Sequence, residues 1–275
     1  MPAPRIAVAE QLPSLEELAF KHGTDKSHDD HKYVDLYSVL FDPIRSTVRN
    51  VTEVGVATGQ SLLMWEEFFY NADIYGIDIH ANAKARSRFV DHGRIHHFEH
   101  ANSQDALAVA KLRTPGHRLP LAFGSMDVIV DDGDHRAAGN QRTLNALWPY
   151  LRPGGIYCIE DIPTGTNSDQ MDYNGIKYGT DGSPRQGFAP LLNTSMWTQA
   201  TKRIFHIESD TFFVDTSAAH RNFELFLKRL NRAGGGKQWA RDIVNHNSHV
   251  LVIRKRFAAR AHHLDIKVGA VAMHR

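Results

Sequence analysis

Acidic residues follow two short apolar runs in the middle of the chain. The sequence reads Asp-Asp-Gly-Asp-His at 131–135 and Glu-Asp at 160–161. If the runs are neighbouring parallel strands, their carboxyl ends meet at one sheet edge, where ligands bind. The carboxylates of Asp132, Glu160 and Asp161 would converge there and repel one another unless a cation lies between them. Hard oxygen ligands favour Mg²⁺ or Mn²⁺ over zinc, so we predict a magnesium site.

A glycine turn follows an earlier apolar run. The pattern from Glu53 is Glu-x-Gly-x-x-x-Gly-x-Ser, through Gly55 and Gly59 to Ser61. It is not the Gly-x-Gly-x-x-Gly dinucleotide fingerprint. An acid on the first strand with glycines after it is typical of S-adenosylmethionine (SAM) binders, because glycine lets the backbone approach a ligand closely. The alternative is a tight strand-to-helix turn without a ligand.

Two further positions fit an adenosine. Asp78 ends the next apolar run, 25 residues after Glu53, and a carboxylate there can accept both ribose hydroxyls. Its alternative role is a helix cap. Ser103 and Gln104 follow the third run, where the adenine edge is usually read in this architecture. A plain N-cap serine explains Ser103 equally well.

His135 lies about one helical turn after Asp132 and could act as a base. An aliphatic hydroxyl has a pKa close to that of water, about 15.7, and a metal lowers such a pKa by several units. Imidazole accepts a proton near neutral pH, and the alkoxide would attack the SAM methyl group in line. Asp131 either faces the SAM amino group or only ends its strand, and Asp134 suits a helix N-terminus.

The elements that position these residues alternate along the chain. Strands are predicted at 51–56, 74–78, 94–99, 126–131 and 155–160, with helices near 61–70, 81–90, 103–113 and 136–151. This alternation predicts an α/β fold with a Rossmann-like, doubly wound, mostly parallel sheet. Later segments 203–208, 211–215 and 249–254 read as extended, 220–232 reads as a helix, and 163–187 reads as a long loop.

A helical N-terminal cap precedes the sheet. Ser14 and Glu17 form a capping-box pattern, and residues 31–41 place apolar residues on one helical face. Tyr33, Tyr37 and Trp65 are expected to pack in the core. We predict a cap over residues 1–48, a SAM-binding methyltransferase domain over 49–255 and a basic tail over 256–275.

Composition excludes several classes of protein. Lys plus Arg total 32 and Asp plus Glu total 31, which argues against nucleic-acid binding. The single Cys158 excludes an intramolecular disulfide and a thiolate zinc cluster. No apolar run approaches the roughly 18 residues of a membrane span, and the N-terminus lacks an apolar signal core. We therefore expect a cytoplasmic protein.

Several motifs together resemble the macrocin and mycinamicin sugar O-methyltransferases and the related cephalosporin hydroxylase-like proteins. They are Gly-Thr-Asp-Lys (23–26), Glu-Val-Gly-Val-Ala-Thr-Gly-Gln-Ser-Leu (53–62) with Trp65, Ile-Tyr-Gly-Ile-Asp (74–78), Asp-Asp-Gly-Asp-His (131–135) and Leu-Arg-Pro-Gly-Gly-Ile-Tyr-Cys-Ile-Glu-Asp (151–161). The resemblance covers roughly residues 15–165. It implies a class I SAM-dependent methyltransferase that requires Mg²⁺ and methylates a sugar hydroxyl of a small molecule.

The resemblance also implies roles for individual residues. It makes Asp132, Glu160 and Asp161 the metal ligands and His135 the base. It assigns Glu53, Gly55, Gly59, Ser61 and Asp78 to SAM, and it makes Lys26, otherwise expected to be solvated, a candidate lid residue over SAM. It suggests a homo-oligomer whose N-terminal segments help close the sites.

Two residues depart from the family pattern. Gln60 stands where the family often has Gly, and Asp134 stands where it often has Ser, which adds charge beside the predicted metal.

Three alternative functions stay open. A catechol-type O-methyltransferase also uses an acid-bound Mg²⁺, but its metal set usually ends in Asp-Asn rather than Glu-Asp. A non-catalytic SAM-binding partner subunit has no need of a metal and a base. The glycine spacing argues against a nicotinamide oxidoreductase.

Overall fold

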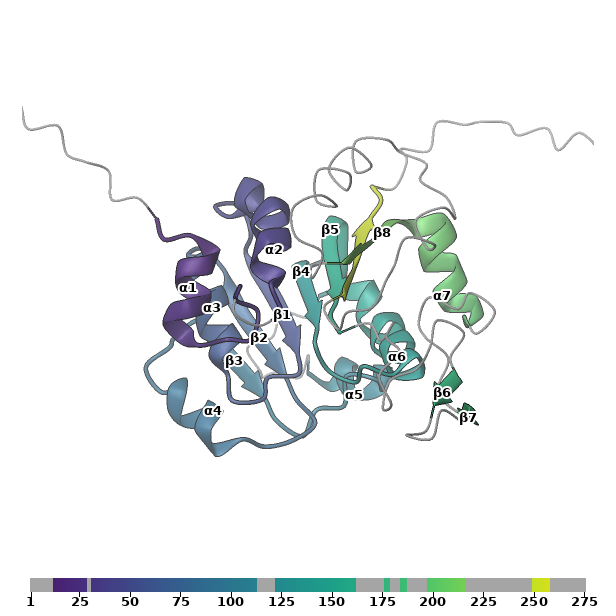
Figure 1. The fold of residues 1–275 in the computed structure, drawn as a ribbon, viewed down its shortest axis with the longest axis horizontal. Coiled ribbons are helices and arrows are strands. Elements are labelled where there is room, and N and C mark those ends of the chain that lie inside the picture. Colours follow the sequence, from purple (N-terminus) through teal and green to yellow (C-terminus); the bar gives the residue numbers. More distant parts are fainter. Residues whose placement is uncertain are drawn as a thin grey trace, which may run out of the picture.

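The core of the structure is one seven-stranded sheet in the order β3-β2-β1-β4-β5-β9-β8 (Figure 1). This computed structural model describes residues 12–28, 31–112, 122–161, 176–178, 184–186, 197–215 and 249–257. The first five strands pair in parallel, and β9 pairs antiparallel with both β5 and β8. The predicted mostly parallel sheet is confirmed. Its strands are β1 (Asn50–Val54), β2 (Asp73–Ile77), β3 (Ile95–Phe98), β4 (Met126–Asp131), β5 (Leu151–Ile159), β8 (Ser209–Asp215) and β9 (His249–Lys255).

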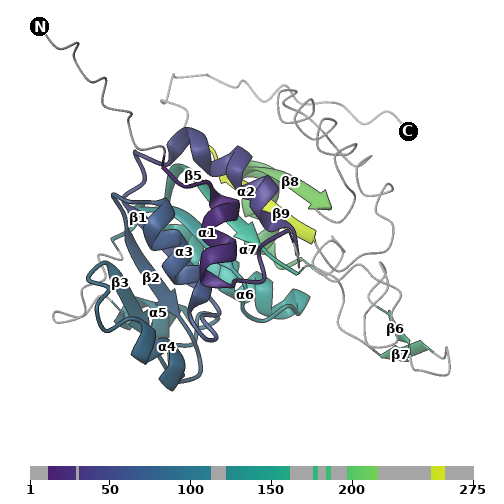
Figure 2. The same cartoon turned by 60° about the vertical axis from the view of Figure 1, so that its left-hand side comes forward.

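Helices cover both faces of this sheet (Figures 1 and 2). One hydrophobic cluster joins helices α1 to α4 to one face, and a second joins α5, α6 and the segment just after α7 to the other. This is the predicted doubly wound arrangement. The helices are α1 (Leu15–His22), α2 (Tyr33–Phe41), α3 (Gln60–Phe68), α4 (Ala83–Arg88), α5 (Ala106–Lys111), α6 (Ala137–Leu147) and α7 (Gln199–Arg203). Short 3₁₀ segments follow α2 (Asp42–Ile44) and α6 (Trp148–Tyr150), and β6 (Ile176–Tyr178) pairs with β7 (Pro184–Gln186).

The strand order creates the edge at which a ligand can bind. The chain moves outward from β1 through β2 to β3, and then crosses back so that β4 lies on the other side of β1. In open α/β sheets, ligands bind at the carboxyl ends of the strands beside such a reversal. The turns after β1, β2, β4 and β5, which carry the predicted site residues, therefore lie along one edge.

The N-terminal helices pack directly on the sheet layer. The capping box is confirmed, because the Glu17 amide donates to Ser14 Oγ at 3.2 Å and the Ser14 amide donates to Glu17 Oε2 at 2.7 Å. The Tyr37 ring meets the Trp65 indole of α3 edge-on, with centroids 5.4 Å apart. The cap and the sheet thus share one hydrophobic cluster, whereas the division into three regions stays a prediction.

Two local predictions are wrong. Residues 203–208 do not form a strand: Arg203 ends α7, and Ile204–Glu208 form a π-helix. The Thr198 side chain caps the start of α7 by accepting from the Thr201 amide. Ile204 and Phe205 are buried there, so packing overrides a strand-like local pattern. The alternative that Ser103 is an N-cap is also wrong, because Asp105 is the N-cap of α5. The helix predicted at 220–232 lies outside the described residues.

Two predictions from composition can be compared with the structure. Cys158 is a free, fully buried thiol inside β5, as expected of a small packing residue. Among the helices that the structure describes, none is both long and apolar enough to cross a bilayer. The long loop predicted at 163–187 falls mostly outside the described residues, and β6 and β7 are its described parts.

Candidate active site at the carboxyl edge of the sheet

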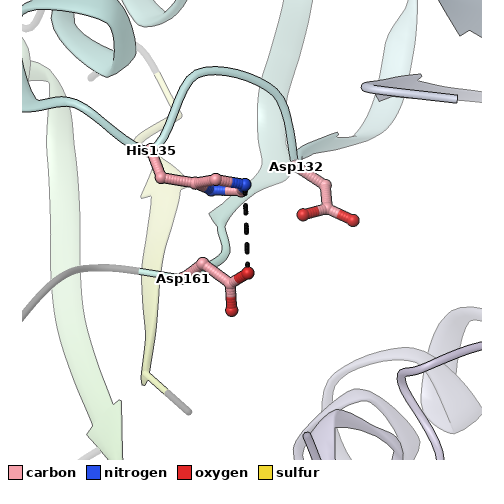
Figure 3. Close-up of side chains that lie close together, drawn as sticks. All are labelled: Asp132, His135 and Asp161. Carbon is pink, nitrogen blue, oxygen red and sulfur yellow. Dashed lines mark ion pairs between the residues drawn. The ribbon is translucent and has the colours of Figure 1, made fainter. Parts of the chain in front are cut away.

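Asp132, His135 and Asp161 form a group that could hold a metal ion (Figure 3). Asp132 and His135 lie in the turn after β4, and Asp161 follows β5. One ligand atom from each residue lies within 4.8 Å of the others. His135 Nε2 is 3.9 Å from Asp161 Oδ2, and the three side chains are partly exposed. The acids after β4 and β5 therefore come together, as their position after neighbouring parallel strands predicts.

Glu160, the third predicted metal ligand, lies in a different environment. Its side chain is 1% exposed, and both carboxylate oxygens have partners. Oε1 accepts from the Tyr37 hydroxyl at 2.5 Å, and Oε2 accepts from the Lys26 ammonium at 2.6 Å. The structure thus places Asp132 and Asp161 beside His135, and it places Glu160 in a buried group with residues of the cap.

Lys26 lies among the carboxylates instead of in solvent. Its side chain is 1% exposed, and Nζ is 2.8 Å from Asp132 Oδ2, 2.6 Å from Glu160 Oε2 and 3.6 Å from Glu53 Oε1. Burial by itself lowers the pKa of the Lys26 ammonium, but the attraction of Asp132, Glu160 and Glu53 outweighs burial and holds that pKa well above its ordinary value. Lys26 is therefore charged at all physiological pH values.

Aromatic residues that the sequence analysis assigned to the core also touch the acids. Tyr33, Tyr37 and Trp65 are fully buried, as predicted. The Tyr33 hydroxyl donates to Asp161 Oδ1 at 2.5 Å, and the Trp65 indole nitrogen donates to Glu53 Oε2 at 2.7 Å. The sequence could have indicated these contacts, because a buried tyrosine hydroxyl or indole N–H needs a hydrogen-bond partner.

Glu53 is a fully buried acid with an incomplete set of partners. Within the described part of the chain, Oε1 has no hydrogen-bond partner, although the Lys26 ammonium lies nearby. Burial raises the pKa of Glu53 to about 7, and the Lys26 charge opposes this rise. Ser61, in the first turn of α3, is also buried and helps to lower the pKa of Glu53.

The two glycines of the turn after β1 are required by contacts within the chain. Both have positive φ angles, 86° at Gly55 and 87° at Gly59. A Cβ atom on Gly55 would lie 2.0 Å from the carbonyl oxygen of Asp132, and one on Gly59 would lie 2.4 Å from the Phe89 ring. Gly55 thus packs the turn after β1 against the turn that carries Asp132.

Asp78 holds the same glycine turn from the side of β2. Its Oδ2 accepts from the amides of Val56 and Ala57 at 2.9 and 3.1 Å, and its Oδ1 accepts from the His80 amide at 2.8 Å. Ala57 has a φ of 47°, in the left-handed region that disfavours residues with a Cβ. Asp78 thereby stabilises a strained turn, and its oxygens keep lone pairs for further donors.

Asp131 is fully buried at the end of β4, opposite Val54 of β1. Its Oδ2 accepts from the Tyr157 hydroxyl at 3.3 Å, whereas Oδ1 finds no hydrogen-bond partner among the described residues. Burial raises the pKa of Asp131 to about 7. The structure therefore leaves a buried acceptor beside the glycine turn.

Ser103 and Gln104 lie in the turn before α5. Ser103 is buried, and its hydroxyl is 3.4 Å from that of Thr143 on α6. The Gln104 amide nitrogen donates to Asp134 Oδ2 at 2.9 Å, and the Arg142 guanidinium donates to Gln104 Oε1 at 2.8 Å. Asp134 also accepts from the Arg136 amide just before α6, which agrees with a helix-start acid. These contacts connect the turn before α5 to the turn after β4 that carries Asp132 and His135.

Comparisons with known proteins give a family match for part of the chain. Residues 52–162 match the family described as methyltransferase domain. The range begins in β1 and ends just after Asp161, so it contains the glycine turn, Asp78 and both acidic turns.

Curated relatives are sugar O-methyltransferases. The chain is 34% identical over 160 residues to 8-demethyl-8-alpha-L-rhamnosyl tetracenomycin-C 2'-O-methyltransferase of Streptomyces olivaceus, covering 56% of this chain and 39% of that protein. It is 31% identical over 180 residues to mycinamicin VI 2''-O-methyltransferase of Micromonospora griseorubida, covering 61% and 42%. The predicted resemblance is confirmed, although the chain spans about two fifths of the length of these relatives.

One solved structure is also similar in sequence to part of this chain. A methyltransferase from the mycinamycin biosynthetic pathway, solved in complex with Mg and SAH, is 31% identical to this chain. The match has a TM-score of 0.47 and covers 55% of this chain and 40% of the other.

Proposed function

We propose that the protein is a Mg²⁺-dependent O-methyltransferase that transfers the methyl group of SAM to a hydroxyl of a small molecule, in particular a sugar hydroxyl. The observation that carries the proposal is the meeting of Asp132, His135 and Asp161 beside the glycine turn of a methyltransferase domain. The names of the curated relatives support the sugar acceptor.

The residues at the edge of the sheet fit SAM. Asp131 Oδ1 is a buried acceptor without a donor, and a ligand ammonium group would satisfy it. Asp78 lies at the end of β2, where its carboxylate can accept ribose hydroxyls in addition to the backbone amides it already holds. When bound, SAM supplies the electrophilic methyl group. Asp78, on the β2 side of β1, would hold the adenosine, and Asp131, on the β4 side, would hold the amino acid end.

The metal group fits Mg²⁺ better than a softer ion. Mg²⁺ is usually held by one or two carboxylates and keeps several waters, and the partly exposed Asp132 and Asp161 offer such a set. A bound Mg²⁺ lowers the pKa of a hydroxyl that it coordinates. Tyr33 and Lys26 hold Asp161 and Asp132 from the buried side, so each carboxylate keeps its orientation.

His135 is the group that can remove the acceptor proton. Its side chain is 43% exposed, and Nε2 points toward Asp161 (Figure 3). A neutral imidazole in this position can accept a proton from a hydroxyl placed between it and Asp132. Asp161 then lies near the imidazolium and stabilises its charge. The main remaining contribution of the protein is to hold acceptor and methyl donor in line.

A methylation assay with different acceptors tests the proposed function. The purified chain is incubated with labelled SAM and demethylmacrocin, mycinamicin VI or a catechol, with Mg²⁺ or with EDTA. We expect Mg²⁺-dependent methylation of a sugar hydroxyl, lost in Asp132→Asn, while calorimetry shows S-adenosylhomocysteine affinity within a few-fold of the wild type. Asp210→Asn is the matched control, since it removes an exposed β8 carboxylate that pairs with Arg256.

Each other outcome has a defined meaning. Unchanged turnover in Asp132→Asn, or methylation that survives EDTA, contradicts the metal assignment. Preferred methylation of the catechol favours the catechol-type alternative, and binding of S-adenosylhomocysteine without turnover on any acceptor favours a non-catalytic partner subunit. The homo-oligomer and the cytoplasmic location stay predictions.

A further inference from the structure

A second histidine lies beside the partly exposed end of the candidate site. His31 Nδ1 is 3.8 Å from Asp161 Oδ1, whereas His135 Nε2 is 3.9 Å from Asp161 Oδ2. The two imidazoles therefore lie beside different oxygens of one carboxylate, near the place where an acceptor hydroxyl must reach His135. The proposed reaction uses His135 as the base and does not use His31.

His31 presents an aromatic ring that the protein supports from behind. Its imidazole stacks on the Tyr33 ring, with the centroids 5.3 Å apart and the planes 14° from parallel. Tyr33 is fully buried, and its hydroxyl donates to Asp161 Oδ1 at 2.5 Å. The His31 side chain is nevertheless 26% exposed. The ring thus rests on the core and keeps an accessible part beside Asp161.

The backbone holds His31 at this position. The His31 amide donates to the Asp25 carbonyl at 2.9 Å, and the Lys32 amide donates to the Ser27 carbonyl at 2.8 Å. Lys32 has a φ of 60°, which bends the chain between His31 and the start of α2. Because hydrogen bonds and this bend fix the segment, the ring is preorganised for contact with a ligand.

Orienting Asp161 does not account for His31. The 3.8 Å between His31 Nδ1 and Asp161 Oδ1 is too long for a hydrogen bond, and the same oxygen already accepts from the Tyr33 hydroxyl. A substitution at His31 therefore leaves the donor that holds Asp161 in place. The ring is available for a separate task at the same opening.

We propose that His31 is an acceptor-binding residue, whose imidazole packs against the sugar ring that carries the reactive hydroxyl. The inference rests on the proposed function, because it needs a sugar hydroxyl beside Asp132 and His135. One face of a sugar ring presents C–H groups, and these pack favourably on the electron-rich face of an aromatic ring. An acceptor held by its hydroxyl at the metal group and by its ring at His31 has one orientation toward the methyl donor.

Kinetics with His31 variants test this contact. The assay uses labelled SAM, Mg²⁺ and whichever sugar acceptor the wild type methylates, mycinamicin VI or demethylmacrocin. His31→Ala should raise the acceptor KM roughly five- to tenfold, the effect of losing one stacked ring, while kcat and its pH profile stay unchanged. His31→Phe keeps an aromatic face and should keep the wild-type KM. His28→Ala is the matched control, since it removes a histidine of the same turn that pairs with Glu16 and Asp35.

The outcomes separate this inference from the proposed function. A wild type that methylates neither acceptor overturns the proposed function and, with it, the inference. An active wild type with an unchanged KM in His31→Ala overturns only the inference. So does a lowered kcat or a shifted pH profile at unchanged KM, or a His31→Phe variant that is as weak as His31→Ala. If His31→Ala does not fold, His31→Gln replaces it, because glutamine keeps a polar side chain without an aromatic ring.

Discussion

Ionisation of Glu53 should destabilise the folded protein. Burial raises the pKa of this carboxyl from its ordinary 4.5 to about 7, while Lys26 opposes the rise. In the interval between these values the folded chain binds more protons than the unfolded chain, so the free energy of unfolding falls as the pH rises. The difference corresponds to about 3 kcal/mol, because one pKa unit equals about 1.4 kcal/mol.

The substitution Glu53→Gln isolates this effect. Glutamine keeps the shape and still offers a carbonyl oxygen to the Trp65 indole, but it cannot ionise. Relative to the wild type, the variant should gain about 2–3 kcal/mol between pH 5 and pH 8. Urea unfolding at pH 5, 6, 7 and 8 in EDTA measures the gain, and subtracting the wild-type values cancels the titration of all other groups.

Glu17 provides a control of the opposite sign. Hydrogen bonds from Ser14 lower the pKa of Glu17, so its contribution to stability is present at higher pH and is lost as the pH falls. Glu17→Gln should therefore remove stability at pH 5 and above without the gain expected at Glu53. If the free energy of unfolding of Glu53→Gln and of the wild type changes in parallel from pH 5 to pH 8, ionisation of Glu53 does not destabilise the fold.

Three further substitutions test other parts of the site. His135→Ala should lower the methylation rate by roughly 10²–10⁴ and flatten its pH profile, and a near-normal rate would assign the proton to another group. Gly55→Ala should destabilise the fold by more than about 3 kcal/mol in urea unfolding, because its Cβ would overlap the Asp132 carbonyl; a loss below about 1 kcal/mol would contradict this packing. Trp65→Phe leaves the buried Glu53 carboxylate without its donor and should cost about 1–3 kcal/mol, an expectation that an unchanged denaturation midpoint would refute.

The sheet could be predicted because its pattern is local. Short apolar runs separated by helical stretches predict parallel strands, and β1, β2 and β4 all overlap the predicted ranges. Parallel strands carry the residues after their carboxyl ends to one edge, so the meeting of Asp132 and Asp161 follows from topology alone. The strand predicted at 203–208 failed because burial of its apolar residues in a helical segment decided the conformation.

The separate environments of Glu160 and Asp161 could not be read from the sequence. The two acids are consecutive, and the prediction placed both on one metal ion. Asp161 has a φ of 50°, so the backbone turns sharply there. One carboxylate is consequently directed inward to Tyr37 and Lys26, and the next lies beside His135. Aspartate tolerates a positive φ better than most residues with a Cβ, but this tolerance does not select the turn over an extended strand end, so tertiary contacts decide it.

The N-terminal helical cap supplies hydrogen-bond donors to the acids at the sheet edge. Lys26, Tyr33 and Tyr37 each place one polar group on an acid that follows β4 or β5. Acids gathered at a sheet edge would repel one another in a domain that lacked these donors. The charge of this acidic edge is therefore balanced by a segment that precedes the matched residues 52–162, and that range alone does not contain these three donors.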